Sequence, residues 1–300
     1  MFVALRKKTY LCRPKKILEE RLTQYLQSMS KKKVLFVTQE MDPYTALGEI
    51  SELAKDLPKK AHGALDVRIL MPKFGPINER RHKLHEVVRL SGLNIIVDDE
   101  DYPLIIKVAS LPNTRMQVYF LDNEEFFSRK NFFHDDDESV FEDNQERMVF
   151  FCKGVFETVK KFGWAPDIIH AHGWFTSLIP AYLKTVYKDE PIFENSTCIF
   201  SPYATNLEEH FTPKFREIAT IMGIEEDSDL DPFFVDGKIR LQLGGMHYAD
   251  ALALGSVDLN GDEKALFDSA DKPKIDVASV EENLPAYVDF YKSLLVEEEA

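Results

Sequence analysis

The stretch that decides the fold is KVLFVTQEMDPYTALGEISEL, residues 33–53. Its opening run, VLFV (34–37), is short and continuously apolar, which predicts a strand that is covered on both faces. Residues 48–60 then carry apolar side chains at helical spacing, and DVRILMP (66–72) follows as a second strand. Because a strand, a helix and a second strand in this order form a βαβ unit, the expected fold class is α/β.

The same alternation continues along the chain. Residues 148–162 place apolar side chains at i, i+3 and i+4 spacing, which predicts a helix with a buried stripe. PDIIHAHGWFTSLIPAYLKTVY (166–187) predicts a strand, a turn and a helix, and STCIFSPYA (196–204) predicts another strand. Residues 85–122 differ, because β-rich segments separated by turn signals predict an inserted antiparallel patch. The sequence therefore predicts a Rossmann-like, doubly wound parallel sheet with a β-rich insertion.

Length, composition and charge exclude several classes of function. The chain has 300 residues, of which 44% are hydrophobic, so it can bury a full core. The formal net charge is −14, yet residues 1–33 carry ten Lys/Arg against two Asp/Glu, which leaves −22 on the rest. An acidic body of this kind is repelled by nucleic acid and by anionic membranes, so neither is an expected partner.

The sequence also points to a compartment. No apolar stretch approaches the roughly 20 residues needed to cross a bilayer, and the N-terminus lacks the apolar region of a secretory signal. The three cysteines, Cys12, Cys152 and Cys198, are an odd number without zinc-like spacing. Reduced thiols are typical of the cytosol, so we expect a cytoplasmic protein that uses no metal and no membrane anchor.

Both ends of the chain differ from the middle. Residues 1–31 form a basic leader. It is either a targeting or membrane-surface arm or a segment upstream of the true translation start, since MSKKKVLFVT at Met29 looks like a natural N-terminus. Residues 32–260 are predicted to form the Rossmann-like domain. Residues 261–300 are acidic, and VEENLPAYVDFYKSLL (280–295) predicts a helix within this tail.

Polar and aromatic residues follow two of the predicted strands. His170 and His172 close one strand, and Ser201 and Tyr203 close the next. The carboxyl ends of parallel strands meet at one edge of a sheet, where ligands bind in open α/β folds. The His-x-His pair lacks a third metal ligand at a suitable spacing, so we favour hydrogen bonding that holds the turn over zinc binding. The acidic run HDDDE (134–138) predicts a solvated loop.

Four ordered blocks resemble the N-terminal half of bacterial glycogen synthases and plant starch synthases. Residues 33–53 resemble the family's opening block, K-ILFV-SE-AP-KTGGLADV, and DVRILMPKFG (66–75) resembles DVRVVMPRYG. PDIIHAHGWFTSLIPAYLK (166–184) is similar to PDIVHAHDWHTALAPAYLK, and GGMHYADAL (244–252) is similar to KGGI-YADAV. Four blocks in order are far more specific than any one of them. The chain is thus identified as a member of this family of retaining glycosyltransferases, over roughly residues 32–256.

This resemblance implies a GT-B architecture, in which two Rossmann-like domains face each other across a cleft. In the family the N-terminal domain mostly handles the acceptor glucan, and the C-terminal domain binds most of the nucleotide sugar. About forty residues follow the last block, so the donor-binding half is expected to be absent. The implied activity is hexosyl transfer from ADP-glucose to an α-1,4-glucan, without a cofactor, and a second polypeptide would supply the missing half.

The family's donor loop, KTGGL, has a lysine and two glycines that face the donor, and this chain differs from the family at two of these three positions. Where the family has the lysine of KTGGL this chain has Ala46, and where it has the second glycine this chain has Glu49. Gly48 is retained and suits the start of the following helix. A carboxylate at this place repels a diphosphate by about 1–4 kcal/mol at 4 Å, depending on the effective dielectric. We therefore expect the grip on the donor to be lost.

The sugar-binding landmarks change as well. The HAHDWH block keeps His172 and Trp174 but has Gly173 in place of the aspartate and Phe175 in place of the following histidine. The TIHN-type strand end is FSPY here, so Tyr203 follows a proline and no general acid remains there. The predicted residues of the sugar or acceptor cleft are Tyr44, His172, Gly173, Trp174 and Tyr203. Aromatic rings among them would stack on sugar faces if one pocket collects them.

Two hypotheses of different class follow. In the first, the chain is part of a glycogen or starch synthase and acts with a second polypeptide. In the second, it is a non-catalytic pseudoenzyme domain that binds glucan or a partner protein. A third possibility, a nucleotide-sugar binder in which Glu49 accepts sugar hydroxyls, has no further support in the sequence.

Overall fold

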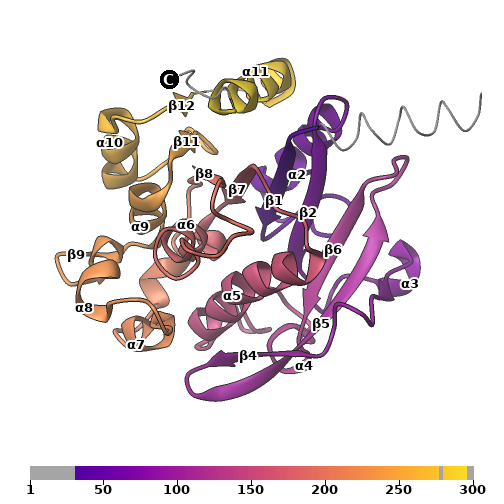
Figure 1. The fold of residues 1–300 in the computed structure, drawn as a ribbon. Helices are drawn as coiled ribbons and strands as arrows, with labels where there is room; N and C mark the ends of the chain where they lie inside the picture. The colour runs from indigo at the N-terminus through magenta and orange to yellow at the C-terminus, as the bar shows by residue number, and fades with distance from the viewer. Residues whose placement is uncertain (1–30, 277–279, 296–300) are drawn as a thin grey trace, which may run out of the picture.

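A mixed ten-stranded sheet organises the molecule, in the order β12-β11-β8-β7-β1-β2-β6-β5-β3, with β4 paired to β5 (Figure 1). The computed structural model describes residues 31–276 and 280–295. The strands of this sheet are β1 Lys33–Thr38, β2 Asp66–Pro72, β3 His85–Glu86, β4 Leu93–Val97, β5 Glu100–Ser110, β6 Gln117–Asp122, β7 Ile168–His172, β8 Thr197–Ser201, β11 Ala251–Ala253 and β12 Lys274–Ile275. A separate hairpin joins β9 Phe234–Val235 to β10 Lys238–Ile239.

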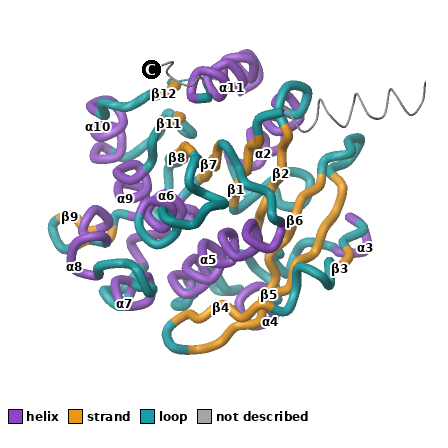
Figure 2. Tube along the Cα trace, viewed as in Figure 1, coloured by secondary structure: helices purple, strands orange, loops and turns teal. Residues whose placement is uncertain are grey.

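Helices alternate with the strands of the sheet, as the purple and orange segments in Figure 2 show. The helices are α2 Glu49–Ala61, α3 Glu79–His82, α4 Glu124–Phe127, α5 Asn144–Phe162, α6 Leu178–Lys184, α7 Phe215–Ala219, α8 Glu226–Asp229, α9 Leu241–Tyr248, α10 Gly261–Ser269 and α11 Val280–Leu294, with short 3₁₀ turns η1 Trp174–Thr176, η2 Leu207–His210 and η3 Asp231–Phe233. One group of helices joins α2 to α11, and another joins α5 to α6 and α7, with α9 on α6.

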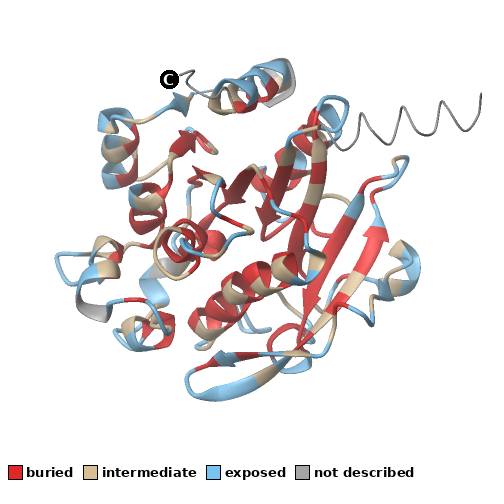
Figure 3. Ribbon diagram, in the orientation of Figure 1, coloured by how far each residue is buried: buried red, intermediate tan, exposed pale blue. Residues whose placement is uncertain are grey.

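The strands at the centre of the sheet are parallel and buried. β1 pairs in parallel with β2 on one side and with β7 on the other, so it lies in the middle of the sheet. Residues 34–37 of β1 are almost completely buried, as expected for a strand that is covered on both faces. Figure 3 shows the same pattern, with the buried residues concentrated on the central strands and on the helix faces that cover them. The predicted α/β, Rossmann-like parallel sheet is therefore confirmed.

The antiparallel patch predicted for residues 85–122 is confirmed. β3 and β4 both pair antiparallel with β5, which is the expected insertion. β6 also pairs antiparallel with β5, as expected, and its other edge pairs in parallel with β2, so β6 joins the insertion to the central sheet. The physical reason is burial: residues 118–121 of β6 are all buried, so the strand needs cover on both of its faces.

The two ends of the chain have different outcomes. The predicted basic leader, residues 1–31, lies outside the described residues except for its last residue. In the predicted tail, the expected helix is present as α11, and it packs against α2. β12, from the same tail, pairs in parallel with β11. The acidic segment after residue 260 thus adds a strand and helices to the sheet.

Two further observations concern the cysteines and the lipid bilayer. Cys152 and Cys198 are both free and fully buried, whereas Cys12 lies outside the described residues. Within residues 31–276 and 280–295, no helix combines the length and the apolar character needed to cross a lipid bilayer.

Candidate functional site

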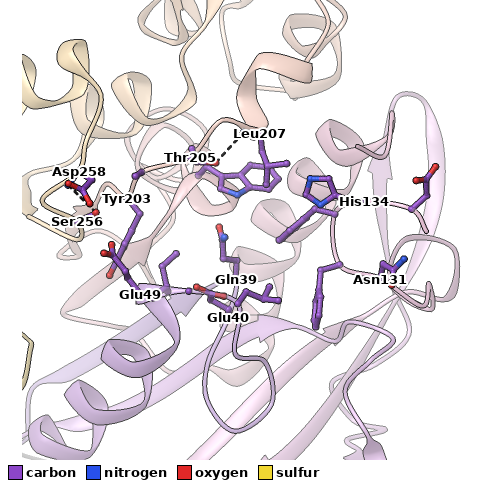
Figure 4. Close-up of a pocket in the computed structure, with 18 of the residues that line it drawn as sticks. Gln39, Glu40, Glu49, Asn131, His134, Tyr203, Thr205, Leu207, Ser256 and Asp258 are labelled. Atoms are coloured by element: carbon purple, nitrogen blue, oxygen red, sulfur yellow. Dashed lines mark hydrogen bonds between the residues drawn. The ribbon is translucent and has the colours of Figure 1, made fainter. Parts of the chain in front are cut away.

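A cavity of about 700 Å³ opens where the parallel strands end, and we call it the carboxyl-edge cavity. Its walls come from the segments that follow β1, β7, β8 and β11, together with the loop 131–136. In Figure 4, Gln39 and Glu40 lie on one side, with Tyr203 towards Ser256 and Asp258. Open α/β sheets bind ligands at this edge because the strand ends leave a crevice there.

The segment between β1 and α2 turns back on itself before the helix begins. The hydroxyl of Thr38 donates to the carbonyl of Glu40 at 2.8 Å, and the N–H of Met41 donates to the hydroxyl of Thr45 at 2.8 Å. Gly48 is the N-cap of α2, with extended backbone and no side-chain cap of its own. The first N–H groups of α2 therefore need a partner from elsewhere.

The carboxyl group of Glu40 lies against this uncapped helix start. Glu40 is only 3% exposed, and burial raises the pKa of its carboxyl group. The hydroxyl of Ser51 and the backbone N–H groups at the start of α2 oppose this rise by stabilising the charged form. Its Oε1 lies on the side of Gly48, within 3.5 Å of the place where a Cβ on that glycine would stand. Its Oε2 is buried and has no hydrogen-bond partner.

Gly173 fills the turn after β7 because no other residue fits there. Its φ of 79° and ψ of 174° belong to a region that side chains avoid. A Cβ at Gly173 would stand 2.7 Å from Cδ1 of Ile50 and 2.9 Å from Oε1 of Gln39. The same Gln39 oxygen accepts a hydrogen bond from the N–H of Phe175 at 3.2 Å, which ties the two turns together. Any side chain at this position would be strained by the backbone conformation and would have to displace the ends of Ile50 and Gln39.

His170 and His172 form a buried, neutral pair. Their ring centroids are 3.9 Å apart. The two ring nitrogens of His170 hydrogen-bond to the hydroxyls of Tyr291 and Ser201, at 2.6 and 2.8 Å. Nδ1 of His172 lies 3.3 Å from the hydroxyl of Tyr203, and its Nε2 has no partner.

Burial decides the charge of both rings. Burial lowers the pKa of His172 to about 3. It lowers the pKa of His170 well below its usual value, and the neighbouring His172 lowers the pKa of His170 further. Both imidazoles are therefore neutral at pH 7. Their contacts join α11 to the strand ends, and neither residue lines the carboxyl-edge cavity.

Two of the three predicted aromatic residues meet at the cavity. Trp174 and Tyr203 both line it, and Trp174 packs edge-on against Phe133 at a centroid distance of 5.0 Å. Tyr44 lies elsewhere: its ring packs edge-on against Phe120 at 4.9 Å, and its hydroxyl donates to the carbonyl of Ser110 at 3.3 Å. The aromatic surface of the cavity therefore comes from the segments that follow β7 and β8 and from the loop 131–136, without Tyr44.

The carboxyl-edge cavity is acidic. Its described lining residues include no Lys and no Arg, and their carboxylates are those of Glu40, Glu49, Asp135, Asp136 and Asp258. His134 is the histidine that lines it. Within residues 31–276 and 280–295, no three His, Cys, Asp or Glu side chains are arranged to hold a metal ion. The charge of the cavity suits a neutral ligand with many hydroxyl groups better than an anion.

The predicted site residues separate into two sets. Gly48, Glu49, Trp174 and Tyr203 line the cavity, whereas Tyr44, Ala46, His172 and Gly173 do not. Sequence reasoning missed Glu40, Ser256, Asp258 and the loop 131–136. Glu40 could have been found from its place three residues after the strand predicted at 34–37, at the edge where ligands bind. The loop 131–136 carried no comparable signal.

Comparison with known proteins places the chain in a family. Residues 33–259 match the family described as starch synthase catalytic domain, and the chain belongs to this family. It is 32% identical to the glycogen synthase of Chlorobium limicola over 226 residues, which are 75% of this chain and 45% of that protein. It is 40% identical to the glycogen synthase of Chlorobium luteolum over 168 residues, 54% of this chain and 34% of that protein. The chain thus spans about half the length, or less, of these curated relatives.

A solved structure shows the same fold. The catalytic domain of starch synthase IV from Arabidopsis thaliana, bound to ADP and acarbose, superposes with a TM-score of 0.66 at 16% identity. The match covers 85% of this chain and 53% of that domain. The chain therefore has the fold of about half of a GT-B glycosyltransferase catalytic domain, which agrees with the single Rossmann-like domain predicted from the sequence blocks.

Proposed function

We propose that this chain binds α-glucan in the carboxyl-edge cavity and does not by itself transfer glucose from ADP-glucose. The observation that carries the proposal is the lining of the cavity, which combines carboxylates and aromatic rings with no Lys or Arg among the described residues. Carboxylates accept hydrogen bonds from sugar hydroxyls, and aromatic rings pack on the apolar faces of sugars. Membership of the starch synthase catalytic domain family supports glucan as the ligand class.

The donor loop supports the second half of the proposal. A phosphate binds at a helix N-terminus through free N–H groups and the positive end of the helix dipole. Here the carboxyl group of Glu40 already faces the start of α2, and Glu49 adds a second carboxylate in the first turn. Ala46 supplies no compensating charge. A diphosphate at this helix start would meet two carboxylates and no cation from its own loop.

Two assays test the proposal. In affinity electrophoresis, the purified chain is expected to be retarded in gels that contain glycogen and to migrate freely in gels that contain dextran. In the transfer assay, the chain with labelled ADP-glucose and glycogen is expected to incorporate no label. Absence of retardation would remove glucan as the ligand, and incorporation by the chain alone would overturn the non-catalytic half.

A second candidate function is the acceptor-side half of an active synthase that acts with another polypeptide. It is favoured by apolar side chains near the cavity: Leu47, which lines it, is 44% exposed, and Val257, between two lining residues, is 58% exposed. Exposed apolar groups beside a functional cleft are typical of a surface that a partner covers. Adding a separately expressed donor domain of a glycogen synthase to the transfer assay tests this candidate. Incorporation that needs both chains would support it.

The proposed location is the cytoplasm. Both described cysteines are free thiols in the core, which is typical of proteins that fold in a reducing compartment. Fractionation of cells with an antibody against the chain would test the location.

A further inference from the structure

One atom in the carboxyl-edge cavity lacks the partner that its burial demands. Among the described side chains, the buried polar atoms without a hydrogen-bond partner belong to Glu40, Glu146, Arg147, His172 and Ser177. Of these residues, Glu40 is the one that lines the cavity. Buried carboxylate oxygens are rarely left unpaired, because desolvation without a hydrogen bond is costly. The free oxygen therefore indicates a position where a ligand group completes the site.

The surroundings of Glu40 fix which oxygen is free. Oε1 faces Gly48 at the start of α2, where the N–H groups and the hydroxyl of Ser51 stabilise the charged carboxylate. Oε2 is the atom without a partner. The carboxyl group is thus stabilised by the helix start, while Oε2 is buried without a partner in a residue that lines the cavity. A side chain that is 3% exposed and held in this way keeps its orientation without a ligand.

We infer that Oε2 of Glu40 accepts a hydrogen bond from a hydroxyl group of the bound sugar and so anchors the ligand in the carboxyl-edge cavity. This inference rests on the proposed glucan binding and names the residue that recognises the ligand. The acceptor character of Oε2 selects neutral hydroxyl donors and rejects anionic groups, because a carboxylate has no hydrogen to offer them. Trp174 and Tyr203 then supply the apolar contact, while Glu40 supplies the polar one.

The substitution Glu40→Gln tests the inference with little change in shape. The N–H groups at the start of α2 will hold the amide oxygen, so the amide NH₂ will replace Oε2 on the cavity side. The substitution therefore replaces the charged acceptor Oε2 with a neutral NH₂ donor and changes no other group. Because hydrogen bonds to charged groups are stronger than neutral ones, the affinity for maltoheptaose in isothermal titration should fall by about 5- to 20-fold. Glu52→Gln is the matched control, since Glu52 lies in the first turn of α2, is exposed and does not line the cavity.

The outcomes separate the inference from the proposed function. Wild-type protein that does not bind maltoheptaose would overturn both. Wild-type binding that Glu40→Gln leaves unchanged would overturn the role of Glu40 and leave glucan binding intact. Thermal unfolding checks that the variant folds. If Glu40→Gln does not fold, Glu40→Asp keeps the charge but withdraws the carboxyl group by one methylene, and unchanged affinity in that variant would equally overturn the inference.

Discussion

Substitution of Gly173 by alanine tests whether the turn after β7 excludes a side chain. The conformation at Gly173, with φ 79° and ψ 174°, costs a residue with a side chain about 1–3 kcal/mol. The new Cβ would also stand 2.9 Å from Oε1 of Gln39, and displacing that oxygen breaks its hydrogen bond to Phe175, at a cost of about 0.5–1.5 kcal/mol. The expected loss of unfolding free energy is therefore about 1.5–4.5 kcal/mol.

Two other glycines provide matched controls. Gly92 has a φ of 80°, but a Cβ added there would meet no atom within 4 Å, so Gly92→Ala measures the backbone strain without the contact. Gly261 has neither a positive φ nor a neighbour within 4 Å, so Gly261→Ala should have little effect on stability. The difference between Gly173→Ala and Gly92→Ala then reports the contact with Gln39 and Ile50 together with the strain that the ψ of 174° at Gly173 adds.

Urea unfolding followed by circular dichroism and tryptophan fluorescence measures these free energies. The order of destabilisation should be Gly173→Ala, then Gly92→Ala, then Gly261→Ala. If Gly173→Ala is no more destabilising than Gly92→Ala, the steric argument is refuted. If the argument holds, Gly173→Asp will be at least as destabilising, and restoring the family's aspartate alone will not rebuild the family's cleft.

Three further predictions concern the donor loop and the network behind the cavity. The double variant Ala46→Lys/Glu49→Gly should bind ADP measurably more tightly than the wild type in isothermal titration, because it removes a carboxylate and adds a cation; equal affinity would show that the loop does not set donor binding. Since burial lowers the pKa of His172 to about 3, the unfolded state binds more protons at this residue below about pH 6.5. His172 should therefore contribute a fall in unfolding free energy of about 1.4 kcal/mol per pH unit from that pH towards 3, and His170, whose pKa burial also lowers, should add to the slope. His172→Gln should make this dependence shallower, and an unchanged slope in urea titrations would contradict the assignment. Tyr203→Phe should cost about 0.5–1.5 kcal/mol of stability by removing the hydroxyl beside His172, while its ring keeps glycogen retardation near the wild-type level.

Local patterns carried most of the information about the fold. The apolar run at 34–37, the helical spacing after Gly48 and the strand at 66–72 each depend on neighbours in the chain, so periodicity alone located β1, α2 and β2. Four ordered blocks were enough to identify the family, which the match over residues 33–259 confirms. The antiparallel pairing of β6 with β5 was predicted, whereas its parallel pairing with β2 was not, because that pairing depends on burial between segments distant in the chain.

Some features of the candidate site also follow from the sequence, and others depend on the tertiary structure. The sequence by itself determined that strand-end residues such as Trp174 and Tyr203 lie at the carboxyl edge, because all parallel strands end on the same side of a sheet. Only the tertiary structure decided that Tyr44 packs against Phe120 away from the cavity, and that the loop 131–136 closes one wall. It also decided that Glu40 turns towards the start of α2 with one oxygen unpaired, since burial and hydrogen-bond partners arise from segments distant in the chain.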